Sequence, residues 1–425
     1  MTQTLNGNVT KGPTDRVGTV CRGCGAALRH VFVDLGMSPL CESFRSADEL
    51  NTMEPFFPLR TYVCEECFLA QLEEYVAPES IFLDYAYHSS YSSSWLGHSR
   101  DYVETMIGRL GLDERSRVIE LGSNDGYLLQ YFVERHVPVL GIDPAHNLAA
   151  FARERGVTTL EAFFGATLAR DLVASGQQSD LIVANNVLAQ APNLHDFFEG
   201  VRLLLGSRGT FSVEVPHLLR LIEGNQFDTI YHEHFSYFSL LSLEPLLASH
   251  GLVVFDVEEL PTHGGSLRLF VRHEADSTRA ITGRVQELRT RERTAGLTTL
   301  EFYDAFRNRV HETKHRLLQC LIDLKRNGHA IVGYGAPGKA NTLLNYCGIR
   351  TDILEFTVDL NPHKQGLFTP GTHIPILHPN AIAETRPSHI LILPWNLREE
   401  IMQQLSYVRD WGCKFIIAIP EPRII

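Results

Sequence analysis

The sequence predicts an α/β protein in which a small cysteine-rich lobe precedes two units of alternating strands and helices. Residues 18–90 are rich in Cys, Pro and aromatic residues and lack a helical period, whereas residues 91–275 alternate helical and strand patterns. A charged helical connector at 276–328 follows, and the alternation restarts at 329–425. Such alternation is typical of parallel sheets covered by helices. Residues 1–17 are polar, and we expect a disordered tail there.

Composition excludes several classes of protein. The chain of 425 residues carries a net charge of −12, whereas a general nucleic-acid binder normally shows a basic stripe. No run approaches the roughly 20 apolar residues that span a bilayer, and the first residues lack the apolar core of a signal peptide. Four of the eight cysteines occur singly, which disfavours a disulfide framework. We therefore expect a cytoplasmic protein without membrane or nucleic-acid partners.

Two Cys-x-x-Cys pairs predict a metal site in the first lobe. Cys21 and Cys24 precede Cys64 and Cys67 by about 40 residues, and the two pairs complete a closed four-thiolate zinc site. Such a site has no open coordination position, so its expected role is structural. The alternatives are unrelated reduced thiols or a redox pair. Cys41 lies between the pairs and is interpreted as an ordinary thiol.

The central unit opens with a glycine turn after a buried strand, in the run Glu-Leu-Gly-Ser-Asn-Asp-Gly at 120–126. About 20 residues later a second strand ends at Asp143, where a carboxylate suits ribose hydroxyls. A dinucleotide site would need three glycines and a pyrophosphate at the helix N-terminus. Here the acidic residue Glu120 disfavours phosphate and favours a cationic sulfonium, so the turn predicts S-adenosylmethionine; the alternative is a turn without a ligand. The predicted cofactor contacts are Glu120, Gly122, Asn124, Gly126, Tyr127, Asp143 and Asn185.

The loop after the fourth strand of this unit carries three amide side chains. Asn185, Asn186 and Gln190 lie at a strand end, where α/β sheets bind ligands. We interpret them as hydrogen-bonding groups of the site. The alternative is that they satisfy the backbone of their own loop.

The densest group of functional side chains is the run Tyr-His-Glu-His-Phe-Ser-Tyr at 231–237. Methylation of carbon requires a base that removes a proton next to a ketone and donors that stabilise the enolate oxygen. Histidine suits the first role, with a carboxylate neighbour, and tyrosine the second. The candidates are Tyr231, His232, Glu233, His234 and Tyr237, and chemistry alone does not choose between the two histidines. The alternatives are a His-x-His metal site and buried structural polar groups.

Two further stretches are candidates for a substrate pocket. Tyr85, Tyr87 and Tyr91 lie in a hydroxyl-rich segment that joins the first lobe to the central unit. They are interpreted as lining a sugar pocket, and the alternative is a solvated linker. His263 begins a second glycine turn, which either closes over the same site or is only a hairpin turn.

A second glycine loop, Gly-Tyr-Gly-Ala-Pro-Gly-Lys at 333–339, follows a strand and opens a helix in the last unit. Its Gly-x-Gly-x-x-Gly register, with Asp359 about 20 residues later, is typical of an NAD site. Backbone amides at a helix N-terminus and Lys339 also suit the pyrophosphate of a nucleotide sugar. Gly335 and Lys339 are therefore candidate substrate contacts, and the alternative is a structural turn.

Five motifs in this order resemble those of the sugar C-methyltransferases of antibiotic deoxysugar pathways, which methylate C3 or C5 of TDP-4-keto-hexoses. They are the paired Cys-x-x-Cys knuckles, Glu-Leu-Gly-Ser-Asn-Asp-Gly, Tyr-His-Glu-His-Phe-Ser-Tyr, His-Gly-Gly-Ser-Leu-Arg and Gly-Tyr-Gly-Ala-Pro-Gly-Lys. The resemblance implies a zinc lobe, a central class I (Rossmann-like) methyltransferase domain and a C-terminal Rossmann-like domain, with the substrate in the cleft between them.

The resemblance also implies roles for single residues. His234 would be the general base, Glu233 and Tyr231 would assist it, Tyr85 would orient the sugar, and Lys339 would meet the pyrophosphate. One position departs from the family, which often has a histidine where this chain has Gln190. Glutamine donates and accepts hydrogen bonds but takes no proton near pH 7. The departure bears on which sugar and which ring carbon this member accepts.

The expected function is therefore methylation of a TDP-linked 4-keto-deoxysugar next to its ketone, at C3 in preference to C5. S-adenosylmethionine would be the donor, S-adenosylhomocysteine the product, and one zinc ion structural. His232 remains a second candidate in the catalytic group. We expect a monomer or weak homodimer. The alternatives are an NAD-dependent sugar-nucleotide oxidoreductase and a non-catalytic zinc scaffold that binds sugar nucleotides.

Overall fold

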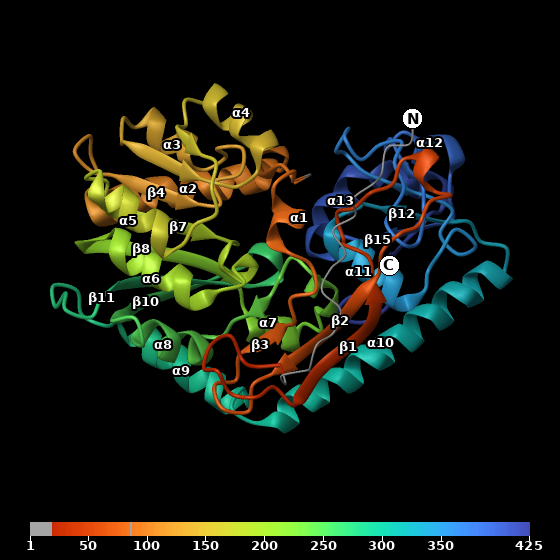
Figure 1. Cartoon of the computed structure of the whole chain (residues 1–425). Coiled ribbons are helices and arrows are strands. Elements are labelled where there is room, and N and C mark those ends of the chain that lie inside the picture. The colour runs from red at the N-terminus through yellow and green to blue at the C-terminus, as the bar shows by residue number, and fades with distance from the viewer. Residues whose placement is uncertain (1–18, 86) are drawn as a thin grey trace, which may run out of the picture.

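A computed structural model describes residues 19–85 and 87–425; the predicted tail at 1–17 lies outside these residues. Three sheets organise them, with four, seven and six strands. Figure 1 shows the seven-stranded sheet and its helices on the left and the six-stranded sheet on the right, with the strands of the first lobe lower down between them. The predicted α/β fold class is confirmed.

The seven-stranded sheet of the central unit has the order β10-β11-β8-β7-β4-β5-β6. Strands β4 to β8 are parallel, and β11 pairs antiparallel with both β8 and β10. The strand order reverses at β4, because β5 and β6 follow on one side of it and β7 on the other, and open α/β sheets bind ligands at such a point. The strands are β4 Val118–Leu121, β5 Val139–Ile142, β6 Thr159–Leu160, β7 Ser179–Asn185, β8 Leu205–Pro216, β10 Leu252–Leu260 and β11 Ser266–His273.

Helices cover this sheet, and their ends follow local sequence signals. Helix α2, Ser93–Leu110, begins after Ser92, whose hydroxyl accepts a hydrogen bond from the amide of Trp95, and it ends at Gly111 with φ of 66°. A hydroxyl cap and a left-handed glycine are common helix boundaries. The others are α3 Leu129–Glu134, α4 His146–Glu154, α5 Ala166–Ala174, α6 Leu194–Leu204, α7 Leu218–Glu223 and α8 Leu240–Ala248.

The six-stranded sheet of the C-terminal unit has the order β14-β13-β12-β15-β16-β17, parallel except for β17. Both β12 and β15 are buried throughout, as expected for strands covered on two faces. The strands are β12 Ile331–Tyr334, β13 Thr357–Val358, β14 Ile376–Leu377, β15 His389–Ile392, β16 Lys414–Ile417 and β17 Arg423–Ile424. The helices are α11 Gly338–Cys347, α12 Ala381–Thr385 and α13 Arg398–Gln404.

The sheet of the first lobe receives one strand from the central unit. Its order is β1-β2-β3-β9, with β1 His30–Ser38, β2 Phe57–Val63, β3 Ala70–Leu72 and β9 Ser236–Tyr237. Strand β9 is the end of the polar run at 231–237, and it pairs antiparallel with β3. The short helix α1, Pro78–Phe82, follows this lobe. The sequence did not indicate that the polar run joins the first lobe in this way.

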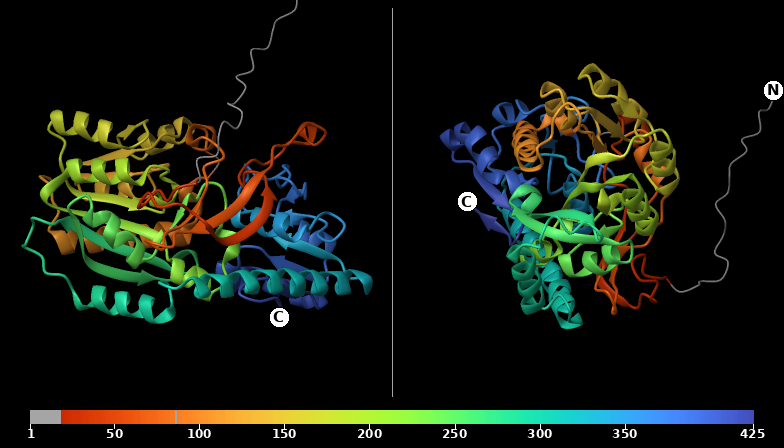
Figure 2. Two further views of the ribbon diagram at one scale, coloured as in Figure 1. Left: turned by 60° about the horizontal axis from the view of Figure 1, so that its bottom comes forward. Right: turned by 90° about the vertical axis from the view of Figure 1, so that its left-hand side faces the viewer.

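The predicted connector contains two helices, α9 Gly283–Ala295 and α10 Leu300–Arg326. Helix α10 buries a stripe that includes Tyr303, Phe306 and Val310, as expected for an amphipathic helix. Figure 2 shows this long helix lying along the C-terminal unit. No helix among the described residues combines the length and the apolar character that a membrane span requires.

Candidate active site

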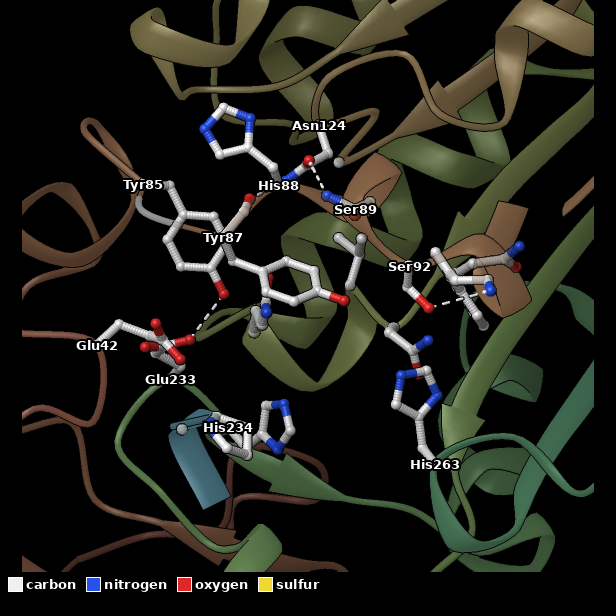
Figure 3. Close-up of a pocket in the computed structure, with 18 of the residues that line it drawn as sticks. Glu42, Tyr85, Tyr87, His88, Ser89, Ser92, Asn124, Glu233, His234 and His263 are labelled. Carbon is white, nitrogen blue, oxygen red and sulfur yellow. Dashed lines mark hydrogen bonds between the residues drawn. The ribbon is translucent and has the colours of Figure 1, made fainter. Parts of the chain in front are cut away.

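A cavity of about 960 Å³ lies where the three parts of the chain meet. The glycine turn of the central unit, the run at 231–234 and the glycine loop of the C-terminal unit all line it. Figure 3 shows Tyr85, Glu233, His234 and His263 around this space. Motifs that are far apart in the sequence therefore share one cavity.

The turn between β4 and α3 brings the backbone close to its neighbours. Gly122 lines the cavity with φ of 66°, and a Cβ there would lie 2.3 Å from the side chain of Val187. Gly126 has φ of 79°, and its Cβ would lie 3.1 Å from the Cα of Ala152. Only glycine meets both conditions without strain. Gly126 supports the turn from behind, whereas Tyr127, next in the chain, lines the cavity.

Carboxylates surround this turn. Asp143 lines the cavity at the end of β5, and its carboxylate accepts hydrogen bonds from the amides of Asn124, at 2.8 Å, and Ala145, at 2.9 Å. Glu120 is fully buried behind the turn and does not itself line the cavity. Burial raises the pKa of both carboxyls, that of Glu120 strongly. Of these two carboxyls only that of Asp143 reaches the cavity, where it fits a ligand rich in hydroxyls.

Asn124 connects the turn to the tyrosine-rich segment. Its side-chain oxygen accepts from the amide of Ser89 at 3.0 Å, and its side-chain nitrogen donates to the carbonyl of Tyr87 at 3.1 Å. Asn124 has φ of 49° and lines the cavity together with Tyr87. The segment from the first lobe is thereby fixed against the turn.

The end of β7 offers polar groups with no partners. Asn185 is buried, and both polar atoms of its side chain lack a hydrogen bond within residues 19–85 and 87–425. Asn186, with φ of 58°, and Gln190 line the cavity beside it. Buried amides left open in this way fit ligand contacts, and together with the carboxylates they fit S-adenosylmethionine.

His234 is buried and lines the cavity. Its Nδ1 lies 3.2 Å from the carbonyl oxygen of Thr229, which can only accept, so Nδ1 carries the proton and Nε2 keeps a lone pair. Burial is the main cause that lowers the pKa of His234 to about 4, and the neighbouring His263 and Lys339 act in the same direction. The imidazole is therefore neutral at neutral pH and able to accept a proton.

Glu233 is the centre of a buried polar group. The hydroxyl of Tyr85 donates to its Oε2 at 2.8 Å, and the thiol of Cys41 donates to its Oε1 at 3.3 Å. Burial, together with the neighbouring charge of Glu42, raises the pKa of Glu233 to about 7. The interpretation of Cys41 as an ordinary thiol missed this contact, because 192 residues separate the two side chains in the sequence.

The two other candidates of the 231–237 run do not line the cavity. His232 packs against β2, with its Nε2 3.2 Å from the carbonyl oxygen of Pro58 and its ring 5.9 Å from that of Phe57. Tyr237 is buried within β9. Tyr231 does line the cavity, with its ring centroid 4.2 Å from that of His234. The structure therefore places His232 away from the cavity that the other catalytic candidates, His234, Glu233 and Tyr231, line.

The loop between β12 and α11 forms the opposite side of the cavity. Gly335 has φ of 90°, and a Cβ there would lie 2.6 Å from Pro394. The ammonium of Lys339 donates to the side-chain oxygen of Asn396 at 2.9 Å and lies 5.0 Å from the ring of Trp395. Burial lowers the pKa of Lys339, and the charge of Asp228 opposes that shift. A cation at a helix N-terminus fits an anionic group.

The remaining candidates, Tyr91 and His263, lie at the edge of the cavity. Tyr91 is half exposed, and its hydroxyl lies 3.0 Å from the Nε2 of His363 in the C-terminal unit. His263 has φ of 54° and packs edge-on against Trp95, with ring centroids 4.9 Å apart. Both line the cavity.

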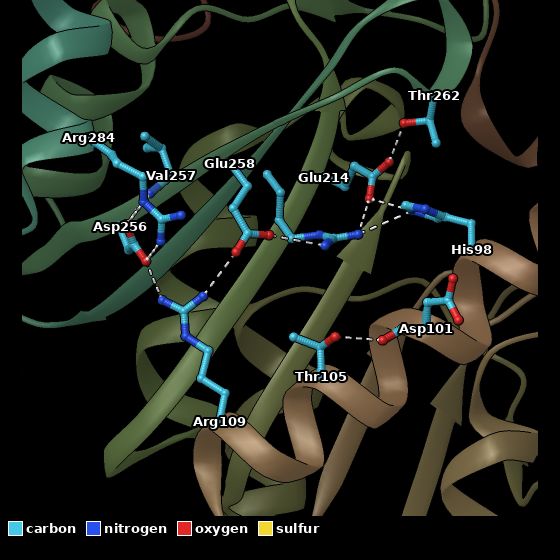
Figure 4. Close-up of polar contacts among 11 residues, drawn as sticks. His98, Asp101, Thr105, Arg109, Glu214, Asp256, Val257, Glu258, Thr262 and Arg284 are labelled. Carbon is cyan, nitrogen blue, oxygen red and sulfur yellow. Dashed lines mark hydrogen bonds and ion pairs between the residues drawn. The ribbon is translucent and has the colours of Figure 1, made fainter.

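A buried ion-pair network holds the turn that carries His263. Glu214 of β8 accepts hydrogen bonds from Arg268 and Thr262 at 2.8 Å and lies 3.1 Å from His98 (Figure 4). Burial alone would raise the pKa of Glu214, but its contacts with His98 and Arg268 hold it at about 2. Figure 4 also shows Arg109 and neighbouring acidic residues extending the network along the hairpin. No local sequence pattern indicates this support, since its members come from three separate segments.

The four predicted zinc ligands come together. Each sulfur of the first knuckle lies 3.5 Å from one sulfur of the second, in the pairs Cys21–Cys67 and Cys24–Cys64. All four sulfurs lie within 4.8 Å of one another. A tetrahedral zinc thiolate site has sulfurs about 3.8 Å apart. The residues therefore fit zinc, and four thiolates leave no open position for chemistry.

Three family models match the chain in series. A zinc binding domain matches residues 21–82, a methyltransferase domain residues 96–257, and a C-methyltransferase C-terminal domain residues 261–420. The C-methyltransferase NovU of Streptomyces niveus is 36% identical over 405 residues, which cover 95% of this chain and 96% of NovU. This chain belongs to the C-methyltransferase family.

Two solved methyltransferases match part of this C-methyltransferase. The CcbJ methyltransferase of Streptomyces caelestis is 16% identical, with a TM-score of 0.32 over 42% of this chain and 90% of that one. A methyltransferase of Anabaena variabilis that depends on S-adenosylmethionine is 13% identical, with a TM-score of 0.34 over 41% of this chain and 84% of that one.

The enzyme is thus an S-adenosylmethionine-dependent C-methyltransferase with a structural zinc site. Family membership sets aside the oxidoreductase and scaffold alternatives. The roles of the individual cavity residues stay predictions.

Proposed function

We propose that this C-methyltransferase methylates a ring carbon adjacent to the ketone of a TDP-linked 4-keto-deoxysugar, C3 in preference to C5. The product would enter the biosynthesis of an antibiotic or another secondary metabolite. The observation that carries the proposal is the free Nε2 of His234, which belongs to a neutral imidazole in the cavity that Gly122 and Lys339 also line.

The nucleotide diphosphate would bind on the side of the C-terminal unit. The ammonium of Lys339 and the N-terminus of α11 offer positive charge to a pyrophosphate. A diphosphate there would also offset the charge that Lys339 exerts on His234. The pKa of the imidazole would then rise, so substrate binding would strengthen the base.

The sugar would lie between His234 and Glu233. Nε2 of His234 removes the proton from the carbon beside the ketone, and the electron pair of that C–H bond moves into the enolate. The hydroxyl group of Tyr231 is the candidate donor to the enolate oxygen, whereas Tyr85, whose hydroxyl donates to Glu233, would orient the sugar. S-adenosylmethionine, when bound, supplies an electrophilic methyl group to the carbon. Gln190 would contact the sugar as a hydrogen-bonding amide.

Proton exchange tests this assignment without methyl transfer. A TDP-4-keto sugar incubated with the enzyme in deuterated water, without a methyl donor, should gain deuterium at the carbon that becomes methylated. His234→Gln should slow this exchange at least about 100-fold, because a general base contributes that much.

His232→Gln is the matched control, since its side chain comes from the same turn but packs against β2. This variant should keep exchange near the wild-type rate. Unchanged exchange in His234→Gln, or methylation of oxygen or nitrogen by the wild type, would contradict the proposal.

A further inference from the structure

The first zinc knuckle contains an arginine that the proposed mechanism does not use. Arg22 lies between Cys21 and Cys24, but its guanidinium reaches the 231–237 run. Its Nη1 donates to the carbonyl oxygen of Phe235, and its Nη2 donates to the carbonyl oxygen of Leu72 at 2.8 Å. Its Cζ lies 5.5 Å from the ring centroid of Phe235. The residue held in this way follows His234 directly in the chain.

The backbone of Phe235 is held on both sides. Its carbonyl oxygen also accepts from the amide of Leu72 at 2.9 Å, and its own amide donates to the carbonyl of Ala189 at 2.7 Å. Arg22 therefore locks a junction between β3, the loop that carries Gln190 and the segment of the proposed base. A planar guanidinium is suited to this task because it donates to two acceptors with fixed geometry.

The zinc knuckle in turn fixes Arg22. The backbone amide of Arg22 donates to the side-chain oxygen of Gln71 at 2.9 Å, and the side-chain nitrogen of Gln71 donates to the sulfur of Cys21 at 3.1 Å. The position of the arginine is thus tied to a thiolate of the zinc site, and a change in that site is transmitted through Arg22 to Phe235.

The ring of Phe235 extends the same connection to a second functional group. Phe235 is buried against Ile81 and Phe82, and the ring of Phe82 packs edge-on against that of Tyr85 at 5.6 Å. Tyr85 donates to Glu233. A displacement of Phe235 would therefore alter both sides of the sugar site.

We propose that Arg22 is a positioning residue for methyl transfer, which couples the structural zinc site to the placement of His234 and Tyr85. This inference rests on the proposed function of those two side chains. Arg22 forms its hydrogen bonds with residues 71–72 and 235–236, the last through the hydroxyl of Ser236 at 3.3 Å, whereas the donor turn lies at 120–126. Loss of the guanidinium should therefore lower kcat and leave affinity for S-adenosylhomocysteine unchanged.

The test compares Arg22→Gln and Arg22→Lys with Arg307→Gln in the full-length, zinc-loaded enzyme. Arg307 is the matched control, because its guanidinium on α10 donates to carbonyls of the same lobe, those of Val31 and Phe32, but not to the 231–237 run. The measurements are zinc content, S-adenosylhomocysteine affinity, kcat, KM and amide hydrogen exchange of the peptide 229–238.

We expect Arg22→Gln to lower kcat about 10- to 100-fold, the cost of a small misplacement of reacting groups. Zinc content, KM and S-adenosylhomocysteine affinity should stay at wild-type levels, and the peptide 229–238 should exchange faster. Arg22→Lys should recover only part of kcat, because one ammonium cannot match the two-acceptor geometry. Added methylguanidine should restore activity to Arg22→Gln, and Arg307→Gln should keep wild-type kcat.

Wild-type kcat and wild-type exchange in zinc-loaded Arg22→Gln would overturn the inference. Loss of zinc in both Arg22 variants, or an equal loss of kcat in Arg307→Gln, would also overturn it, because the effect would then be general. These readings do not depend on which residue is the base. Wild-type deuterium incorporation into the sugar by His234→Gln would reject His234 as the base. The kcat and the amide hydrogen exchange of the Arg22 variants would still show whether Arg22 positions this segment.

Discussion

The two glycine turns of this enzyme have nearly the same backbone architecture and opposite chemistry. Each follows a parallel strand, opens a helix and faces the cavity, at Gly122 and at Gly335. In each, an aspartate at the end of the next strand accepts a hydrogen bond from an amide of the turn, Asp143 at 2.8 Å and Asp359 at 2.7 Å. Turn geometry alone therefore does not determine the ligand.

The charged side chains around the turns make the difference. The first turn is flanked by the buried carboxyls of Glu120, Asp125 and Asp143, which suit a sulfonium and ribose hydroxyls. The second has the ammonium group of Lys339, which suits a diphosphate, whereas the nearby ammonium of Lys364 pairs with Glu42 at 3.0 Å. The comparison teaches that a Gly-x-Gly-x-x-Gly register should be interpreted together with its charged neighbours, since on register alone the second loop resembles an NAD site.

The largest expected effect comes from filling the first turn. Gly122→Ala places a methyl 2.3 Å from Val187 at a positive φ, which should weaken S-adenosylhomocysteine binding about 100-fold and leave TDP binding intact. Isothermal titration with each ligand measures both. Gly111→Ala is the control, because it has the same φ but no atom within 4 Å, so it isolates backbone strain. Equal losses for both ligands would contradict the separation of the two turns.

Removing the positive charge of the second turn should weaken the binding of TDP and not that of S-adenosylhomocysteine. Lys339→Met should weaken TDP binding by about 30-fold, because a charge-assisted hydrogen bond contributes roughly 2 kcal/mol. Affinity for S-adenosylhomocysteine should not change. Lys325→Met serves as the control, since that ammonium pairs with Glu355 outside the cavity. A loss of S-adenosylhomocysteine affinity in Lys339→Met would mean that the donor extends to the second turn.

Neutralising the aspartate of the first turn should have a smaller effect. Asp143→Asn should reduce S-adenosylhomocysteine affinity about tenfold, since two hydrogen bonds from ribose hydroxyls would lose their charged acceptor. Asp359→Asn is the matched variant on the other sheet and should leave this affinity unchanged. If both variants lose affinity equally, the aspartates only support their turns.

Enzyme activity should depend on pH through Glu233, which lines the cavity between the two turns. The pKa of Glu233 is about 7, and its carboxylate accepts from both Tyr85 and Cys41 only when it is ionised. Activity should therefore fall as the pH is lowered through about 7, at most about tenfold for each further unit. In Glu233→Gln this fall in activity at low pH should be absent. A wild-type profile of kcat/KM that stays flat between about pH 6 and 8 would contradict this role.

Local chemistry made much of the fold predictable. The four zinc-binding cysteines are found from the sequence because each knuckle is a local pair of thiols, and two pairs suffice for one ion. The glycine turns are likewise visible, because Gly122 and Gly335 follow continuous apolar strands. These signals depend on a few neighbouring residues, so no knowledge of the tertiary structure is needed to recognise them.

Side-chain direction and long-range pairing were not predictable. A turn closed by a hydrogen bond from the amide of His234 to the carbonyl of Tyr231, at 2.9 Å, directs His234 into the cavity and leaves His232 against β2. Two histidines separated by a single residue look alike in a sequence. The contact of Cys41 with Glu233 and the pairing of β9 with β3 join segments more than 150 residues apart, and no local pattern encodes them.

The hydrogen bonds between Asn124 and the tyrosine segment have a consequence for engineering new substrate preferences. Because Tyr87 and Ser89 are bonded to the residue that shapes the donor turn, substitutions in this segment will change cofactor affinity together with acceptor choice. Asn396 and Leu397 border the cavity from the C-terminal sheet, away from that connection. Libraries aimed at new acceptors should start there, where the two affinities vary independently.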